Sequence, residues 1–276
     1  MPVRKSIVKA KLAKNEPVQA FCCHLTDPAV YEMVGRMGFD CIWMDMEHHV
    51  YSLETAQDLI RAASLSPGSD AMVRPAKWEY MRIGRMLEMG AAGIMYPRCS
   101  TAEEAAEVVK YAKFAPLGQR GCDGGNRDMP FCSMDLTEYI EAANRETFIV
   151  IQMEEQSAVD QAEAIGAVDG VDILFFGPGD FSVLEQIPGQ MDHPKVQKAI
   201  EKIAQAAKNT GKHWGMPAGT VERTEELLAM GARFICHGAD VIALKNMLES
   251  IQQTMPKLGF TYRNALSAGA SYMEKA

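Results

Sequence analysis

Eight short apolar runs alternate with longer segments of helical periodicity along most of the chain. Turn-forming residues bound each run, which is typical of strands that are buried on both faces. The expected strands are Val18–Leu25, Asp40–Asp45, Ala71–Arg74, Gly93–Tyr96, Phe148–Met153, Asp172–Gly177, His213–Pro217 and Phe234–His237. An alternation of this kind predicts a parallel sheet whose strands are joined by helices.

The segments that follow the apolar runs place their apolar residues on one face of a helix. Glycine after Met37, Met89 and Met230 supplies the left-handed residue that ends a helix and turns the chain back toward the sheet. The expected helices include Ser52–Ser64, Trp78–Met89, Ala102–Lys113, Gln156–Ile165, Pro194–Lys208, Val221–Met230 and Val241–Ile251.

The rhythm of strand and helix continues for eight units with no linker between them, which favours a closed barrel over a doubly wound sheet. A GxGxxG sequence in the first strand–helix turn would indicate a dinucleotide-binding sheet, and the sequence has none there. We therefore expect an α/β chain that forms one (β/α)8 TIM barrel, for which about 250 residues are typical. The barrel is expected to be a single domain over residues 1–276, with a polar tail over about 260–276.

Composition excludes several classes of partner. A net charge of −8 and a pI near 5.3 argue against a nucleic-acid or anionic-membrane partner, and no run of Lys or Arg offsets that balance. No window approaches the ~18 consecutive apolar residues of a membrane-spanning helix, and the first residues have no signal-peptide core. The seven cysteines are scattered and form no CxxC pair. A reducing cytoplasm is the expected compartment.

Polar side chains collect where the expected strands end. In a β/α barrel the active site lies at the C-terminal ends of the strands. Each residue alone has a structural explanation, because a strand-end Glu often caps the next helix and Gly-Pro-Gly-Asp is ordinary turn sequence. Their convergence on one rim favours a site. The candidates are Asp45, Glu47, His48, Arg74, Gln152, Glu154, Gly179 and Asp180.

The residue types fit a divalent-metal enzyme that handles an enolate. Hard cations such as Mg²⁺ and Mn²⁺ take oxygen ligands and keep several waters, so Glu154 and Asp180 can suffice to hold one. The cation would act as a Lewis acid on a 2-oxo acid. Arg74 would add fixed positive charge beside the developing enolate oxygen.

The remaining candidates fit the other parts of such a reaction. Histidine is the residue type suited to moving the proton of an aldol hydroxyl, so His48 is the candidate base, with either Asp45 or Glu47 to orient it. The backbone N–H groups of Gly179 and Asp180 are candidates for holding the substrate carboxylate, because a glycine lets a ligand approach closely.

The same residues resemble the HpcH/HpaI aldolases, which are class II 4-hydroxy-2-oxo-heptanedioate and 2-keto-3-deoxy-sugar-acid aldolases. The resemblance runs from Val18 to about Leu248. It includes the Gly90–Gly93, Thr101–Ala105 and Gly118–Gly121 segments. The motifs are Asp45-x-Glu47-His48, Val73-Arg74-Pro75, Gln152-x-Glu154 and Gly177-Pro178-x-Asp180-x-Ser182.

The resemblance implies a role for each matching residue. Glu154 and Asp180 would bind Mg²⁺, Mn²⁺ or Co²⁺, and Gln152 and Gly179 would contact the substrate. His48 would be the base, working through a metal-bound water, and Arg74 would stabilise the transition state. An aspartate from a neighbouring subunit assists the histidine in the family, and the matching position is Glu88, whose carboxylate sits on a longer side chain.

The resemblance also implies a homo-hexamer, built as a trimer of dimers that exchange their last helix, with Tyr262–Ala276 contributing to assembly. Family members usually carry a tryptophan near the end of the first strand, where this chain has Cys22-Cys23-His24. An apolar pair is usual after the fourth strand, where this chain has Arg98-Cys99. Arg98 then indicates either an acidic or phosphorylated aldehyde partner or a subunit contact. His49 is interpreted as peripheral.

Three functions follow from these residues, in order of preference. The first is reversible aldol cleavage of a 2-keto-3-deoxy or 4-hydroxy-2-oxo acid to pyruvate and an aldehyde, with no Schiff-base lysine. The second is an oxaloacetate decarboxylase or a specialised pyruvate-enolate synthase on the same site, and an acyl-CoA substrate is less favoured because no adenine or phosphate site is evident. The third is a non-catalytic scaffold or metabolite sensor, which the intact set of site residues disfavours.

Overall fold

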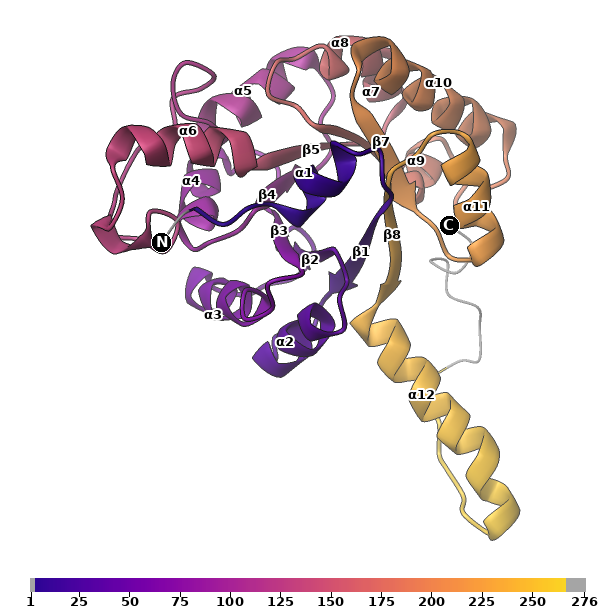
Figure 1. Ribbon diagram of the computed structural model, residues 1–276. Helices are drawn as coiled ribbons and strands as arrows, with labels where there is room; N and C mark the ends of the chain where they lie inside the picture. Colours follow the sequence, from indigo (N-terminus) through magenta and orange to yellow (C-terminus); the bar gives the residue numbers. More distant parts are fainter. Residues whose placement is uncertain (1–2, 267–276) are drawn as a thin grey trace.

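The computed structural model describes residues 3–266 and contains a closed barrel of eight parallel strands (Figure 1). Each strand pairs with the next along the chain, and β1 also pairs with β8. The (β/α)8 architecture expected from the sequence is therefore confirmed. The strands are β1 (Val18–Cys23), β2 (Cys41–Asp45), β3 (Asp70–Arg74), β4 (Gly93–Tyr96), β5 (Phe148–Met153), β6 (Ile173–Phe176), β7 (His213–Pro217) and β8 (Phe234–Ala239).

Helices follow the strands and form an outer ring (Figure 1). Short 3₁₀ turns at Pro130–Cys132 and Met255–Leu258 add to them. The helices are α1 (Ile7–Leu12), α2 (Pro28–Arg36), α3 (Leu53–Ala63), α4 (Tyr80–Glu88), α5 (Ala102–Ala112), α6 (Leu136–Glu146), α7 (Gln156–Asp160), α8 (Ala162–Gly166), α9 (Pro178–Leu184), α10 (Pro194–Thr210), α11 (Val221–Ala229) and α12 (Asp240–Thr254).

The outer helices differ from the sequence-based expectation in two places. The expected helix Gln156–Ile165 is two short helices, because Gln161 leaves the helical conformation with φ −99° and ψ 9°. The Gly-Pro-Gly-Asp segment opens helix α9 instead of forming a turn. Proline fits the first helical position because its fixed φ suits a helix and its missing N–H would have no partner there.

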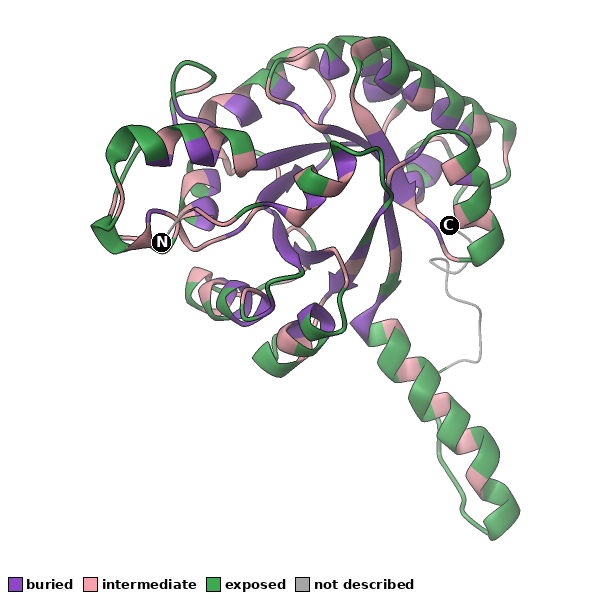
Figure 2. Ribbon diagram, in the orientation of Figure 1, coloured by how far each residue is buried: buried purple, intermediate pink, exposed green. Residues whose placement is uncertain are grey.

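Buried side chains form two layers around the strands. Residues such as Trp43, Met95 and Phe175 fill the barrel interior, and a larger set lies between the strands and the helices. Helix α1 joins the interior set through Val8 and Leu12. Because both faces of the strands are covered, the strands read as continuous apolar sequence (Figure 2). Because apolar side chains fill the barrel interior, a polar site has room only at the ends of the strands.

Helix α12 projects away from the barrel (Figure 1) and is largely exposed along its length (Figure 2). Asp240 is its one buried residue. Residues 259–266 run back beside it, and Asn264 Nδ2 donates a hydrogen bond to Gln252 Oε1 at 3.1 Å. The rest of the expected polar tail, residues 267–276, lies outside the described residues. Among residues 3–266, no helix combines the length and apolar character needed to cross a bilayer.

Candidate active site

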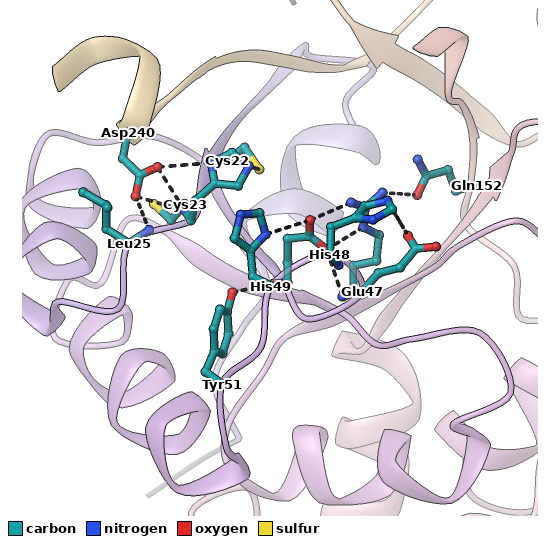
Figure 3. A network of polar contacts seen from close by, with 12 residues as sticks. Cys22, Cys23, Leu25, Glu47, His48, His49, Tyr51, Gln152 and Asp240 are labelled. Carbon is teal, nitrogen blue, oxygen red and sulfur yellow. Dashed lines mark hydrogen bonds and ion pairs between the residues drawn. The ribbon is translucent and has the colours of Figure 1, made fainter. Parts of the chain in front are cut away.

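Arg74 contacts several polar side chains at the C-terminal end of the barrel. Figure 3 shows the network of polar contacts to which Glu47, His49 and Gln152 belong. Arg74 Nε and Nη2 donate to the two carboxylate oxygens of Asp45 at 2.9 and 2.7 Å. Its Nη1 donates to Gln152 Oε1 at 3.1 Å and lies 3.3 Å from Glu47 Oε2. All of the nitrogen atoms of the guanidinium are therefore oriented by groups at the ends of β2 and β5.

Strand register explains why Arg74 and Asp45 meet. The last residues of β2 and β3 are paired, Asp45 with Arg74, and both are buried. The indole of Trp43, two residues earlier in β2, lies 4.7 Å beneath the guanidinium and adds a cation–π contact. Burial alone would raise the pKa of Asp45, but the hydrogen bonds and charge of Arg74 outweigh burial and lower that pKa to about 2. The pair stays ionised across the physiological range.

Gln152 connects this pair to a second carboxylate. Its Nε2 donates to Glu154 Oε1 at 2.7 Å, while its Oε1 accepts from Arg74. Glu154 is buried, and burial raises its pKa to about 8. Arg74 opposes that rise, and the charges of Asp180 and Glu47 add to it. Glu154 therefore lacks the positive charge that a buried carboxylate normally requires.

Glycine at position 177 makes room for that carboxylate. A Cβ atom there would collide with the carboxylate and lie 2.6 Å from Glu154 Cγ. Gly177 also caps α9, whose first turn carries the half-buried Asp180. The turn after β6 thus brings Asp180 close enough for its charge to raise the pKa of Glu154. A group of carboxylates in excess over the cations around them fits a hard divalent cation, and Glu154 and Asp180 are the residues that could hold it.

His48 is placed differently from the buried residues. More than half of its side chain is exposed, and its Nε2 lies 3.7 Å from Glu47 Oε2. Asp45 reaches only the backbone N–H of His48, at 3.5 Å. Of the two carboxylates considered as orienting groups, Glu47 is therefore the one beside the imidazole ring. Burial raises the pKa of Glu47, with Arg74 and His48 opposing that rise.

His49 is not peripheral, contrary to the expectation from sequence. Its Nδ1 lies 3.3 Å from Asp45 Oδ2, the oxygen that also accepts from Arg74 Nη2. Figure 3 shows His49 within this network. Its ring packs on the ring of His24, with centroids 4.6 Å apart. Asp240 holds His24 in turn, at 3.2 Å from its Nδ1. The sequence contains one indication of this arrangement, because His49 and Asp240 both follow the end of a strand.

Glu88 lies away from the network in its own chain. It is the last residue of α4, which precedes β4 and so sits at the opposite end of the barrel from the site. Burial raises its pKa, and its charged neighbours are Arg120, Asp123 and Asp128. Any contribution of Glu88 to catalysis therefore requires a neighbouring subunit, as the resemblance implies.

Two further segments complete the rim. The N–H groups of Gly179 and Asp180 lie in the first turn of α9, where backbone donors have no partner within the helix. The backbone N–H of Arg98 donates to Glu154 Oε2 at 3.1 Å, and its carbonyl accepts from Lys77 Nζ at 2.7 Å. The Arg98 side chain is exposed, and its backbone has a positive φ of 50°. Its backbone therefore positions Glu154.

Known proteins resemble the chain over most of its length. The family model described as HpcH/HpaI aldolase/citrate lyase matches residues 21–246. The 5-keto-4-deoxy-D-glucarate aldolase of Klebsiella pneumoniae is 33% identical over 250 residues, which cover 90% of this chain and 96% of that enzyme. The 4-hydroxy-2-oxovalerate aldolase of Novosphingobium aromaticivorans is 33% identical over 236 residues, 84% of this chain and 87% of that enzyme. The crystal structure of an HpcH/HpaI aldolase from Desulfitobacterium hafniense superposes with a TM-score of 0.86 at 32% identity, covering 92% of this chain and 98% of that one.

Proposed function

The chain belongs to the HpcH/HpaI aldolase/citrate lyase family, and we propose that it is a metal-dependent class II aldolase. Its reaction would be the reversible cleavage of a 2-keto-3-deoxy or 4-hydroxy-2-oxo acid to pyruvate and an aldehyde. The names of the two aldolase relatives support these substrate classes. Aldol cleavage makes the protein a carbon–carbon lyase with small-molecule substrates.

One observation carries the proposal. The buried carboxylate of Glu154 lies in the space left by Gly177, with its pKa raised to about 8 and Asp180 among the charges that raise it. Arg74 is held nearby by Asp45 and Gln152. Excess negative charge beside a rigid guanidinium suits a site that binds a divalent cation and a 2-oxo acid together.

The bound cation, Mg²⁺, Mn²⁺ or Co²⁺, would supply Lewis-acid polarisation of the 2-oxo group. Arg74 faces the oxygen on which enolate charge develops, and its contacts with Asp45 and Gln152 fix it there before the substrate arrives. The N–H groups of Gly179 and Asp180 hold the substrate carboxylate. Gln152 positions both Arg74 and Glu154, so that the ligand and the guanidinium keep their relative orientation.

Proton transfer is assigned to His48. In cleavage, His48 accepts the proton of the C4 hydroxyl as the bond between C3 and C4 breaks, and in synthesis it returns that proton. Glu47 lies beside its ring and the exposed position leaves the ring accessible to substrate. Glu88 of a neighbouring subunit would raise the basicity of His48 in an oligomer.

A cleavage assay with 5-keto-4-deoxy-D-glucarate tests the proposal. We expect pyruvate release to stop when EDTA removes divalent ions and to return with Mg²⁺, Mn²⁺ or Co²⁺. Borohydride should not trap pyruvate on the protein, because no lysine is assigned to the site. Activity that survives EDTA, together with a trapped lysine adduct, would contradict the metal-dependent mechanism.

A second candidate reaction is decarboxylation of oxaloacetate on the same site. The observation that favours it is that the two side chains are held to different degrees. Arg74 is fixed by short hydrogen bonds, whereas the His48 ring is exposed and its contact with Glu47 is long, at 3.7 Å. Decarboxylation requires the cation and Arg74 but no base for an aldol hydroxyl. His48→Ala separates the reactions, because aldol cleavage should fall far more than decarboxylation. Equal losses would remove the support for two distinct reactions.

A further inference from the structure

We propose that His24, Asp45 and His49 form a second metal site, selective for zinc-like divalent ions and separate from the Glu154–Asp180 site. One ligand atom from each of the three residues lies within 4.8 Å of the other two. His24 follows β1, Asp45 ends β2, and His49 lies in the loop after β2. Adjacent strands therefore bring the three groups together at one rim of the barrel.

The spacing of the ligand atoms suits a small cation. His49 Nδ1 and Asp45 Oδ2 are 3.3 Å apart, longer than a good charge-assisted hydrogen bond. Two ligands of a tetrahedral zinc ion at bond lengths of about 2.0–2.1 Å are separated by roughly 3.3 Å. The ring of His24, tilted by 53° against that of His49, supplies the third ligand atom within 4.8 Å of the other two. Three protein ligands leave a fourth position for water.

Surrounding residues already orient these ligands. Asp240 takes the Nδ1 side of His24 at 3.2 Å, which leaves Nε2 as the nitrogen free to bind a metal. The present contact of that Nε2 is a weak one, with Cys22 Sγ at 3.5 Å. The Tyr51 hydroxyl donates to the carbonyl oxygen of Asp45 at 2.6 Å and fixes the start of the loop (Figure 3). Carboxylate–histidine pairs of this kind support metal-binding imidazoles in proteins.

Asp45 has one position left for an ion. Its Oδ1 accepts from Arg74 Nε at 2.9 Å and from the Glu47 N–H at 3.0 Å. Its Oδ2 accepts from Arg74 Nη2 at 2.7 Å and lies 3.3 Å from His49 Nδ1. An ion bound there would draw charge from the carboxylate that anchors Arg74. Occupation of this site should therefore inhibit the enzyme.

Ligand chemistry separates this site from the other one. Imidazole nitrogens favour zinc and neighbouring transition metals, whereas carboxylate oxygens alone favour Mg²⁺ and Mn²⁺. Both sites lie at the same rim of the barrel, which also holds the carboxylates of Glu47 and Asp240. These negative charges offset the positive charge that a second cation would add. Zinc in the presence of excess Mg²⁺ should thus reach the histidine site alone.

Equilibrium dialysis of the full chain against Zn²⁺, with Mg²⁺ in large excess, tests the proposal. We expect one zinc ion per chain in the wild-type protein. His24→Gln combined with His49→Asn should weaken zinc binding by roughly 100-fold or more, because two of three direct ligands are lost and loss of a supporting residue alone costs about 10- to 100-fold. Glu154→Gln should keep the zinc, and His193→Asn, which preserves a helix cap elsewhere, should bind as the wild type does.

Zinc binding is measured here without any aldolase assay, so its failure is distinct from failure of the proposed function. Circular dichroism shows whether the double variant is folded. If it is not, the single variants, each expected to weaken binding, replace it, and the visible absorption of Co²⁺ reports whether imidazole is bound. Wild-type protein without zinc, or zinc that survives the histidine substitutions and is lost in Glu154→Gln, would overturn the proposal.

Discussion

At the scale of the residue, Arg74 sets the charge balance of the site. Its guanidinium contacts three side chains, Asp45, Glu47 and Gln152, from two strand ends. Only Asp45 is fully neutralised by it, and its pKa is lowered to about 2. Glu154 remains under-compensated, with its pKa raised to about 8 by burial. The same guanidinium therefore stabilises one carboxylate and leaves a second one in need of a cation.

Arg74→Lys tests the fixed orientation of the guanidinium. Lysine keeps the charge but cannot form the two-point contact with Asp45 or reach Gln152 at the same time. We expect kcat/KM for aldol cleavage to fall by roughly 100- to 1,000-fold, the range for loss of one oriented donor to a developing oxyanion. Mg²⁺ affinity should change little, because the cation ligands are untouched. A loss below tenfold would contradict the role assigned to Arg74.

Glu154→Gln tests the cost of the buried carboxylate. The pKa of Glu154 in the folded protein lies above its usual value of 4.5. As the pH rises, Glu154 therefore loses its proton in the unfolded chain before it does so in the folded protein. The metal-free wild type then loses stability between about pH 4.5 and pH 8, whereas the Gln variant does not. We expect the variant to be more stable by about 1–3 kcal/mol at pH 8.5 in EDTA, with little difference at pH 5.

Thermal unfolding at the two pH values measures that difference. Added Mg²⁺ should reverse the order at pH 8.5, because only the wild type gains stability from the bound ion. A Gln variant that unfolds at a lower temperature than the wild type in EDTA at pH 8.5 would contradict the account.

At the scale of the element, the turn between β6 and α9 decides where the proposed cation ligands, Glu154 and Asp180, lie. Gly177 ends the strand segment, Pro178 opens the helix, and Asp180 follows within one turn. The missing side chain of Gly177 is the space that Glu154 occupies. The first turn of α9 thus positions Asp180, and the glycine that caps the helix leaves the space for Glu154.

Gly177→Ala tests this arrangement. The added methyl group would collide with the Glu154 carboxylate and displace it from Asp180. We expect Mg²⁺ affinity, measured by calorimetry, to fall by about 10-fold or more, the range for disturbed metal-site support. Gly84→Ala in α4 is the matched control, since a Cβ there meets nothing within 4 Å and alanine favours a helix. Equal affinity in both variants would contradict the role of Gly177.

The elements were the most predictable part of the molecule. All eight expected strands are present in the structure. They could be predicted because strands buried on both faces leave continuous apolar runs in the sequence. Helix α9 was not predicted, since Gly-Pro-Gly-Asp suits a turn as well as a helix start. Strand ends placed Arg74, Gln152 and Glu154 at one rim, as expected. The contact of His49 with Asp45 depends on ring orientation, which spacing does not encode, and Glu88 cannot be placed without a second subunit.

At the scale of the whole molecule, helix α12 is exposed on a face that is apolar. Its apolar side chains recur at intervals of three and four residues, the spacing of a helix face that packs on another element. The exposed members of this face are Val241, Leu244, Met247, Leu248 and Ile251. An apolar helix face that projects from the barrel supports assembly with other copies of the chain, as the resemblance to the family implies.

Leu244→Gln combined with Leu248→Gln tests this assembly. Both side chains are about half exposed in the isolated chain, so the substitution should not unfold the barrel. We expect light scattering after size exclusion to show a hexamer for the wild type and a smaller species for the variant. Lys245→Gln with Glu249→Gln, which removes a partly exposed ion pair on the same helix, should leave the mass unchanged. The same mass in both double variants would exclude α12 as the contact.

Exchange of the methyl protons of pyruvate with D₂O, followed by NMR, tests the central claim most directly. That claim is that Glu154 and Asp180 hold one divalent cation facing Arg74 and thereby stabilise the pyruvate enolate. The account predicts exchange with Mg²⁺, its loss in EDTA, and a decrease of roughly 100-fold or more in Asp180→Asn. Exchange that persists in EDTA, or that is unaffected by Asp180→Asn, would contradict it.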